Sequence, residues 1–298
     1  MSSLVEEASG REYFRAGSEN GSYIVCVANN KNQSQFYSLA RELYLGGVRV
    51  PKLYVVSDDM ELSLQEDFGN DCLLTLSDPY ATDILRETLL QLSLMQCLPF
   101  KQLPMLEEQQ LIQQSRLMHS AFLESFLNVS IDQDFIVWLD AISAAVANQP
   151  EVNCHFDFER RNLFLLPERK IGVIDFQDLC IGPLGTDLAA FTVDHYESFH
   201  ESRVHASCQI FLELTQMKYN KVDLVEMVLM AALQRNARIL GVLSNLYLQQ
   251  NRTFRLPDLE QILKNFIDIS ATLNMKTFSI LDDALSMLPS KVTKICKQ

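Results

Sequence analysis

The chain has 298 residues, more than one small core needs, which favours one large bilobal domain or two domains. Hydrophobic residues make up 48% and charged residues 21% of the sequence, as in ordinary globular proteins, and no apolar run reaches the roughly 18 residues that span a bilayer. The formal net charge of −13 disfavours a nucleic-acid partner, because a phosphate backbone would be repelled.

The first residues and the cysteines indicate the cellular compartment in which the protein is expected. The start, MSSLVEEASGREYF, has no basic segment followed by an apolar one, so no signal peptide is predicted. The seven cysteines are scattered and contain no C-x-x-C pair, so neither a disulfide framework nor a structural zinc site is predicted. We therefore expect a cytoplasmic protein with no membrane partner.

Residues 1–66 are expected to form a small β-rich lobe that contains one helix. EYFRAG and SYIVCVA are strand-like and are separated by turn residues at 18–22. SQFYSLARELYL predicts a helix that ends at Gly46 and Gly47. PKLYVV and MELSLQED predict two further strands on either side of a turn at 57–59.

Residues 72–298 are expected to form a larger, mainly helical lobe, joined to the first by a hinge at 67–71. A helix is predicted with Asp78 as its N-cap and Pro79 in its first turn. Further helices are predicted over DQDFIVWLDAISAAVANQ, over the long apolar run at 221–250, and over LPDLEQILKNFIDIS. The sequence therefore predicts a β-rich lobe followed by a helical one.

One stretch of the helical lobe, NLFLL-PERK-IGVIDF, is strand-like. Two apolar segments flank the polar residues 167–170, which predicts a β-hairpin with a four-residue turn. In that register Asn162 lies opposite Asp175, with Cβ atoms roughly 5 Å apart. An amide oxygen and a carboxylate suit Mg²⁺, which takes few protein ligands and completes its shell with water and phosphate. Asp157 lies at the same end, where a carboxylate would orient a hydroxyl that attacks phosphorus.

The motifs around this hairpin resemble those of a known fold. The spacing His155-x-Asp157-x-x-x-x-Asn162, followed by Ile-Asp-Phe, resembles the catalytic and metal-binding loops of the protein-kinase-like fold. The run IDFQDLCIGPLGTDLAAF resembles the aminoglycoside phosphotransferase and choline kinase-like branch. ASGREYFR, GVRVPKLY, IDFQD and LQRNARILGVLSNLYLQQNR resemble bacterial cell-wall amino-sugar kinases, which phosphorylate the anomeric hydroxyl of N-acetylmuramate and N-acetylglucosamine.

The resemblance implies a bilobal protein-kinase-like fold of the α+β class, a transferase that uses ATP and Mg²⁺, and a sugar 1-phosphate product. It implies that Asp157 is the catalytic residue and that Asn162 and Asp175 hold the metal. It also implies that His155 and Asp187 brace the loops. The residues implied to contact the nucleotide, over the phosphates or at the hinge, are Ser9, Gly10, Arg11, Glu66 and Phe68. A downstream nucleotidyltransferase of peptidoglycan recycling is the partner that the resemblance suggests.

Two stretches depart from the family pattern. No G-x-G-x-x-G is present and the strand YIVCVANN carries no lysine, so Arg11 or Arg15 is expected to neutralise phosphate charge. Glu159 stands where relatives often carry histidine, and Phe156 where they often carry glycine or arginine. Both changes lie on the acceptor side. The residues expected near the acceptor or its carboxylate are Glu159, Arg160, Arg161, Asp178, Arg235 and Arg238.

Two alternatives to the amino-sugar kinase stay open on sequence alone. The acidic balance and Glu159 favour a cationic acceptor, such as an aminoglycoside or choline. The missing strand lysine and glycine-rich loop favour a nucleotide-binding pseudokinase that acts as an interaction module. The presence of Asp157, Asn162 and Asp175 together favours an enzyme.

Overall fold

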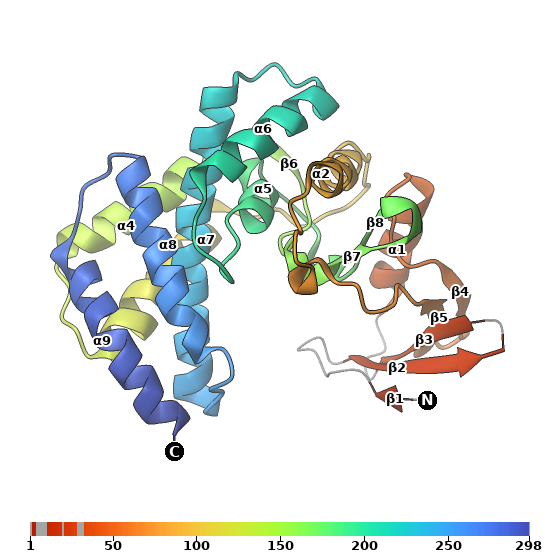
Figure 1. Ribbon diagram of the computed structural model, residues 1–298, viewed down its shortest axis with the longest axis horizontal. Coiled ribbons are helices and arrows are strands. Elements are labelled where there is room, and N and C mark those ends of the chain that lie inside the picture. The colour runs from red at the N-terminus through yellow and green to blue at the C-terminus, as the bar shows by residue number, and fades with distance from the viewer. Residues whose placement is uncertain (1, 4–10, 20, 29–32, 298) are drawn as a thin grey trace. The chain divides into compact units, whose positions relative to one another are not determined.

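The computed structural model describes residues 2–3, 11–19, 21–28 and 33–297. The chain forms two compact units, shown as ribbons in Figure 1. Unit 1 comprises Met1–Gln102 and Asp157–Leu179, and unit 2 comprises Leu103–Phe156 and Cys180–Gln298. The predicted order, a small β-rich region followed by a larger helical one, is confirmed. The lobe boundary at 67–71 stays a prediction.

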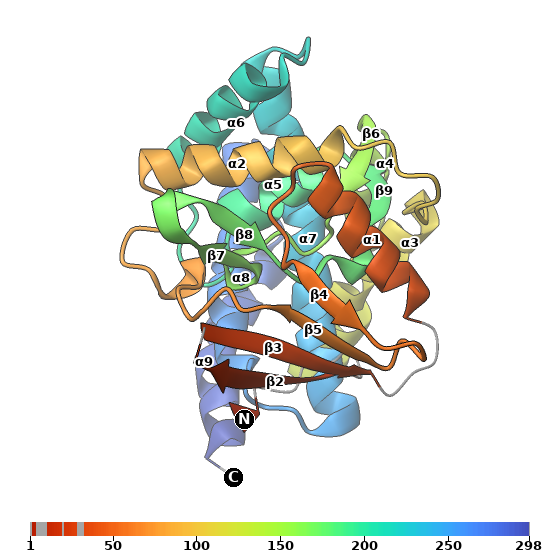
Figure 2. The ribbon, with the colours of Figure 1, turned by 90° about the vertical axis from the view of Figure 1, so that its right-hand side faces the viewer.

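Unit 1 begins with an antiparallel five-stranded sheet in the order β1-β2-β3-β5-β4, visible in Figure 2. Its strands are β1 (Ser2–Ser3), β2 (Arg11–Ser18), β3 (Gly21–Ala28), β4 (Leu53–Val56) and β5 (Leu62–Glu66). Helix α1 (Ser34–Leu45) follows β3 and ends at Gly46, as predicted. A Cβ at Gly46 would meet the side chain of Leu98, so a larger residue at the end of this helix would displace that side chain. Strands β2 to β5 and helix α1 are those that the sequence predicts, whereas β1 was not predicted.

Helix α2 (Thr82–Gln96) begins later than predicted. Its N-cap is Ala81, which has extended backbone angles, and Asp78 instead accepts a turn hydrogen bond from the Ala81 N–H. The predicted N-cap role of Asp78 is therefore wrong, because a turn separates this residue from the helix. The apolar stripe of the helix is buried, including Leu89 and Leu92, and the helix packs on the hairpin.

The hairpin predicted from the sequence is present as β7 (Leu163–Leu165) and β8 (Ile171–Val173). Leu163 pairs with Val173 and Leu165 pairs with Ile171, one residue out of the predicted register. Asn162 consequently faces Ile174, whose N–H donates to its carbonyl at 3.0 Å, and the predicted Asn162–Asp175 pairing is wrong. Both residues still lie at the open end of the hairpin.

The turn of this hairpin explains the error in register. It contains three residues, Pro167–Arg169, and is closed by the Leu166 N–H, which donates to the Lys170 carbonyl at 2.8 Å. Glu168 and Arg169 both have a φ of 57°, in the left-handed region. Neither residue is glycine, so the sequence carries no signal for this tighter turn.

Unit 2 is mainly helical, with one two-stranded pair. Its α- and π-helices are α3 (Glu108–Leu117), the π-helix Met118–Leu127, α4 (Gln133–Ala147), α5 (Gly185–Thr192), α6 (Glu201–Thr215), α7 (Lys221–Gln250), α8 (Leu259–Thr272) and α9 (Ser279–Cys296). The long helix α7 contacts α3, α4, α5, α6 and α8. The predicted helices corresponding to α4, α7 and α8 are confirmed, whereas α3, the π-helix, α6 and α9 were not predicted.

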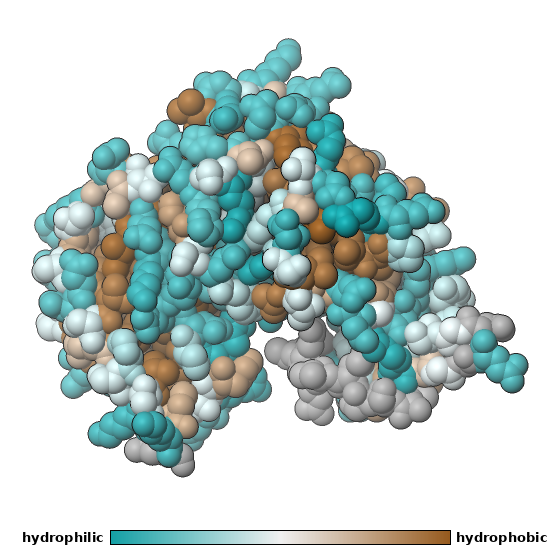
Figure 3. All heavy atoms as spheres, viewed as in Figure 1, coloured by the Kyte–Doolittle hydropathy of each residue, from teal (hydrophilic) through white to brown (hydrophobic). Residues whose placement is uncertain are grey.

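The two strands of unit 2 lie on either side of the hairpin in the sequence. Strand β6 (Glu151–Cys154) and strand β9 (Cys180–Pro183) pair antiparallel. On the face shown in Figure 3, hydrophilic side chains cover most of the helical unit and apolar side chains surface in narrow strips. In the part of the chain that the structure describes, no helix is both long and apolar enough to cross a membrane.

Candidate active site

The catalytic loop, defined as residues 157–162, is fixed by its own hydrogen bonds. The backbone carbonyl of Asp157 accepts from the Glu159 N–H and from the Asn162 side-chain amide, both at 2.9 Å. The Asn162 N–H in turn donates to the Glu159 carbonyl at 2.9 Å. These bonds connect the predicted catalytic residue directly to one of the predicted metal ligands.

The side chain of Asp157 forms an ion pair with Arg161. Arg161 Nη2 lies 2.6 Å from Asp157 Oδ2, and Arg161 Nε contacts the carboxylate of Glu159. The Glu159 side chain is only 2% exposed, whereas that of Arg161 is 41% exposed. A guanidinium therefore lies between a buried carboxylate and the carboxylate expected to orient the acceptor.

The metal loop, defined as residues 175–178, leaves β8 through a left-handed residue. Asp175 has a φ of 65°, and a short 3-10 turn, Phe176–Asp178, follows it. The ring of Phe176 stacks on Phe36 of α1, with centroids 5.2 Å apart and planes within 2°. The side-chain amide of Gln177 donates a hydrogen bond to Asp175 Oδ1. This neutral donor orients the Asp175 carboxylate without placing a positive charge beside it.

The donor groups of Asn162 and Asp175 fit Mg²⁺. Because the Asn162 amide nitrogen is used on the Asp157 carbonyl, its oxygen is the end that can bind a cation. A hydrogen bond from a neighbouring residue, here Gln177, is typical of metal-binding carboxylates. Within the described residues no group of three or more His, Cys, Asp and Glu forms a metal site. A magnesium ion at two oxygen ligands would complete its shell with water and phosphate.

Arg11 is hydrogen-bonded to the metal loop. Its Nη1 donates to Gln177 Oε1 at 3.3 Å, its Nε donates to Gln33 Oε1 at 2.8 Å, and its guanidinium lies 4.3 Å from the ring centre of Phe36. Strand β2 is thus linked through Gln177 to Asp175. Ser9 and Gly10, predicted to contact the nucleotide, lie outside the described residues.

Arg15, the other candidate for phosphate charge, contacts a different segment. Its guanidinium forms an ion pair with Asp67 at 2.6 Å and donates to the Asn70 side chain at 2.6 Å and to the Gly69 carbonyl at 2.8 Å. Of the two arginines on β2, Arg11 is therefore the one connected to the metal loop.

The predicted hinge residues pack against the sheet and the hairpin. Glu66 forms a bidentate pair with Arg49, and its N–H donates to the Lys52 carbonyl at 2.9 Å. Burial would raise the pKa of Glu66, but hydrogen bonds from Arg49 and Lys52 hold it below its ordinary value. The ring of Phe68 fills the space beside Gly172, where a Cβ would come within 2.4 Å of it. Contact of Glu66 and Phe68 with a nucleotide stays a prediction.

Asp187 contacts the segment that leads into the catalytic loop. Its fully buried carboxylate accepts from the backbone N–H of His155 at 2.6 Å and of Phe156 at 2.9 Å. Phe156 has a φ of 73°, which is strained for a bulky residue, and Arg238 of α7 lies 4.3 Å from its ring centre. This is the arrangement expected of a brace, because two charge-assisted hydrogen bonds hold an unfavourable backbone turn directly before Asp157.

The residues expected on the acceptor side are divided between the two units. Arg160 is buried, with its guanidinium 5.4 Å from the ring centre of Tyr80. Asp178 is exposed on the metal loop. Arg235 is buried inside unit 2, where its Nη1 lies 3.4 Å from Nδ1 of His195. Contacts of these side chains with an acceptor stay predictions.

Sequence reasoning missed the residues that orient the predicted ones. Gln177 had a signal, because it is a polar residue two positions after Asp175 in IDFQD. Phe36 had none, because its stacking on Phe176 joins segments far apart in the sequence. Glu159 and Arg161 were both expected near the acceptor, but their pairing with each other was not predicted.

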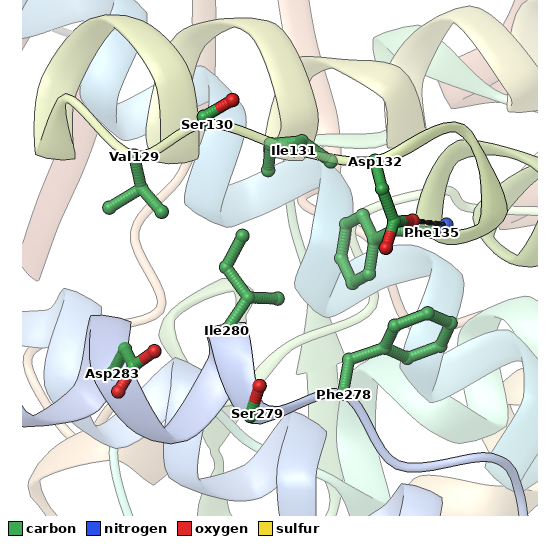
Figure 4. Close-up of a pocket in the computed structure, with 9 residues that line it drawn as sticks. All are labelled: Val129, Ser130, Ile131, Asp132, Phe135, Phe278, Ser279, Ile280 and Asp283. Atoms are coloured by element: carbon green, nitrogen blue, oxygen red, sulfur yellow. Dashed lines mark hydrogen bonds between the residues drawn. The ribbon is translucent and has the colours of Figure 1, made fainter.

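Unit 2 also contains an open pocket of about 400 Å³, shown in Figure 4. It lies between the loop before α4 and the start of α9. The residues that line it are Val129, Ser130, Ile131, Asp132, Phe135, Phe278, Ser279, Ile280 and Asp283. None of the predicted site residues that the structure describes is among those that line this pocket.

Comparison with known proteins gives a family match and two curated relatives. The family model described as the phosphotransferase enzyme family matches residues 2–212. An N-acetylmuramate/N-acetylglucosamine kinase from Pseudomonas aeruginosa is 29% identical over 213 residues, which cover 67% of this chain and 62% of that protein. A kinase of the same name from Neisseria meningitidis serogroup B is 24% identical over 281 residues, 86% of this chain and 81% of that protein. The chain thus matches less than two thirds of the Pseudomonas protein's length.

Solved structures confirm the protein-kinase-like fold. A choline/ethanolamine kinase family protein from Mesorhizobium loti superimposes with a TM-score of 0.65 at 14% identity, covering 96% of this chain and 92% of that one. A spectinomycin phosphotransferase, solved with ADP and spectinomycin, gives a TM-score of 0.60 at 15% identity, covering 91% and 92%. At these identities the likeness concerns the fold alone.

Proposed function

Because the chain belongs to the phosphotransferase enzyme family, we propose that it is an ATP-dependent kinase of a cell-wall amino sugar. The proposed acceptor is the anomeric hydroxyl of N-acetylmuramate or N-acetylglucosamine, and the product is the sugar 1-phosphate. The names of the two curated relatives support this acceptor class. The ADP found in the spectinomycin phosphotransferase, which has the same fold, supports an adenine nucleotide as donor. The cytoplasm and the downstream nucleotidyltransferase stay predictions.

The observation that carries the proposal is the set of oxygen groups at the open end of the hairpin. In this proposal Asp157 holds the acceptor hydroxyl and takes its proton, while Asn162 and Asp175 hold Mg²⁺. When bound, the metal would neutralise charge on the phosphate groups. An anomeric hydroxyl is more acidic than an ordinary alcohol, so a weak base is sufficient to accept its proton.

The environment of Glu159 bears on the nature of the acceptor. A carboxylate that attracts a cationic acceptor would have to face the solvent or the ligand, but Glu159 is buried and paired with Arg161. Of the two features that favoured an aminoglycoside or choline on sequence alone, the charge of Glu159 is thus already matched within the protein, and the overall acidic balance stands. This supports a neutral or anionic acceptor, such as an N-acetylated sugar.

The test is ³¹P NMR of the purified protein with MgATP and each sugar, run beside the Asp157→Asn variant. A sugar 1-phosphate signal that forms with the wild type and not with the variant is the expected result. If choline or an aminoglycoside were phosphorylated instead, the proposed amino-sugar acceptor would be wrong. Nucleotide binding without any Asp157-dependent turnover would favour the pseudokinase.

A further inference from the structure

We propose that Arg161 is a further catalytic residue, which contacts the γ-phosphoryl group of ATP during transfer, and that Glu159 positions it. This inference rests on the proposed phosphotransferase function and adds a residue to its machinery. It starts from the contact between Arg161 and Asp157. Arg161 Nη2 lies 2.6 Å from Asp157 Oδ2, so the guanidinium is already at the carboxylate that orients the acceptor.

The chemistry of transfer brings the phosphoryl group to the same place. The sugar oxygen forms a bond to the γ-phosphorus while the bond from that phosphorus to the bridging oxygen of ADP breaks, and the hydroxyl proton passes to Asp157. Before attack the two reacting atoms are about 3–3.5 Å apart. A guanidinium within one hydrogen bond of Asp157 is therefore within reach of the equatorial phosphoryl oxygens, on which negative charge accumulates.

Glu159 explains why the guanidinium is held in this place. A carboxylate that is 2% exposed is costly unless a cation pairs with it, and Arg161 Nε supplies that cation. The guanidinium is held by Glu159 through Nε, and its Nη2 contacts Asp157. Arg161 nevertheless remains 41% exposed, so it is accessible to a ligand.

The two arginines of strand β2 are bonded to other residues, in one case to a residue of the metal loop. Arg11 donates to Gln33 and Gln177, and Arg15 is bonded to the segment 67–70. Strand β3, GSYIVCVA, carries neither lysine nor arginine. Phosphoryl transfer needs positive charge at the transferred group, and Arg161 is placed to supply it.

The experiment compares kcat and KM of the wild type with those of Arg161→Gln and Arg161→Lys, using N-acetylmuramate and N-acetylglucosamine in turn. We expect kcat to fall about 10²-fold or more in Arg161→Gln, by the same factor with both sugars and with sugar KM little changed. Arg161→Lys keeps the positive charge but loses the planar guanidinium, so its kcat should lie between those of the wild type and Arg161→Gln. Arg169→Gln is the matched control, because Arg169 is an exposed arginine of the same hairpin, paired with Asp83.

Removing Arg161 alone leaves the buried Glu159 without this cation, which could disturb the loop. The double variant Glu159→Gln/Arg161→Gln removes both charges. Its kcat should stay as low as that of Arg161→Gln if the arginine acts on the phosphoryl group. Recovery of kcat in the double variant would instead show that the loss came from the buried carboxylate, and the proposal would be wrong.

Two further results separate this inference from its alternatives. If the substitution of Arg161 raised the KM for N-acetylmuramate only, Arg161 would bind the carboxylate of that acceptor. This result would overturn the proposed contact with the phosphoryl group. If the wild type phosphorylates neither sugar, the proposed acceptor fails, and Arg161 is then tested on the slow transfer from MgATP to water. An unchanged hydrolysis rate in the Arg161→Gln variant would overturn the proposal, whereas a matching loss would support it without any sugar.

Discussion

The catalytic loop and the metal loop each present one carboxylate at the open end of the same hairpin, but the two have different neighbours. Asp157 is ion-paired with Arg161, whereas Asp175 accepts a hydrogen bond from the neutral amide of Gln177. A carboxylate meant for a divalent cation gains from a neutral donor, because a guanidinium would compete with the metal. A carboxylate that orients a hydroxyl next to a phosphoryl group can be paired with a cation. The difference indicates two separate tasks for two chemically identical side chains.

The largest expected effects come from changing each carboxylate to its amide. Asp157→Asn and Asp175→Asn should both lower kcat by about 10³-fold, because one loses the proposed proton acceptor and the other a proposed metal ligand. The two variants should differ in their response to metal, since raising Mg²⁺ or substituting Mn²⁺ should restore part of the activity of Asp175→Asn only. Steady-state rates over a metal titration measure this. Equal rescue of both variants would remove the distinction between the loops.

A smaller effect is expected from the hydrogen bonds around Asp175. Gln177→Ala removes the donor to Asp175, and Arg11→Gln removes the arginine bonded to Gln177. Partners that orient a ligating group are typically worth 10- to 100-fold in metal affinity. We expect the Mg²⁺ concentration for half-maximal rate to rise about tenfold in Gln177→Ala and less in Arg11→Gln.

Arg15→Gln is the matched control for these two variants. Arg15 lies on the same strand as Arg11 but is bonded to Asp67, Gly69 and Asn70. Its substitution should leave the Mg²⁺ requirement unchanged. If Arg15→Gln raised that requirement as much as Arg11→Gln does, the link from β2 to Asp175 through Gln177 would not be specific.

Some elements of the fold could be predicted from the sequence, and others could not. The order of strands β2 to β5 and helices α1 and α7 followed from apolar periodicity and from Gly46, which are local signals. The register of the hairpin did not, because Glu168 and Arg169 adopt left-handed conformations without the usual glycine. A local pattern predicts that a turn exists, but tertiary context decided its length.

The candidate site likewise contains residues that the sequence predicts and contacts that it does not predict. The spacing of Asp157, Asn162 and Asp175 was visible because all three lie in two neighbouring loops. The bond from Arg11 to Gln177 joins positions 166 residues apart, so no spacing in the sequence could indicate it. The residues proposed to carry out the chemistry follow from motifs, whereas their contacts with distant residues depend on long-range packing.

A stability effect is expected where the hinge residues meet the metal-loop strand. A Cβ at Gly172 would lie 2.4 Å from the ring of Phe68, so Gly172→Ala forces that ring or strand β8 to shift. Overpacking of this kind typically costs about 1–3 kcal/mol in unfolding free energy. Gly17→Ala is the control, since nothing lies within 4 Å of a Cβ there. Denaturant unfolding of both variants measures the difference, and equal stability would mean that Phe68 moves freely.

The smallest effect concerns pH and a carboxylate that belongs to neither loop. Burial alone would raise the pKa of Asp67, but hydrogen bonds from Ser22, the Gly69 N–H and Arg15 lower it below its ordinary value. A group whose pKa is depressed by folding stabilises the protein above its unfolded pKa of about 3.9, and this contribution is lost as the pH falls through the folded pKa. Asp67→Asn should therefore lower the unfolding free energy by about 1 kcal/mol at pH 7 and by progressively less toward pH 3. Urea unfolding at several pH values tests this, and a difference that does not shrink in acid would show that Asp67 contributes by packing. Because Asp67 contacts neither loop through these bonds, the Mg²⁺ requirement of the variant should equal that of the wild type, which separates the acid response of the sheet from the chemistry at Asp157 and Asp175.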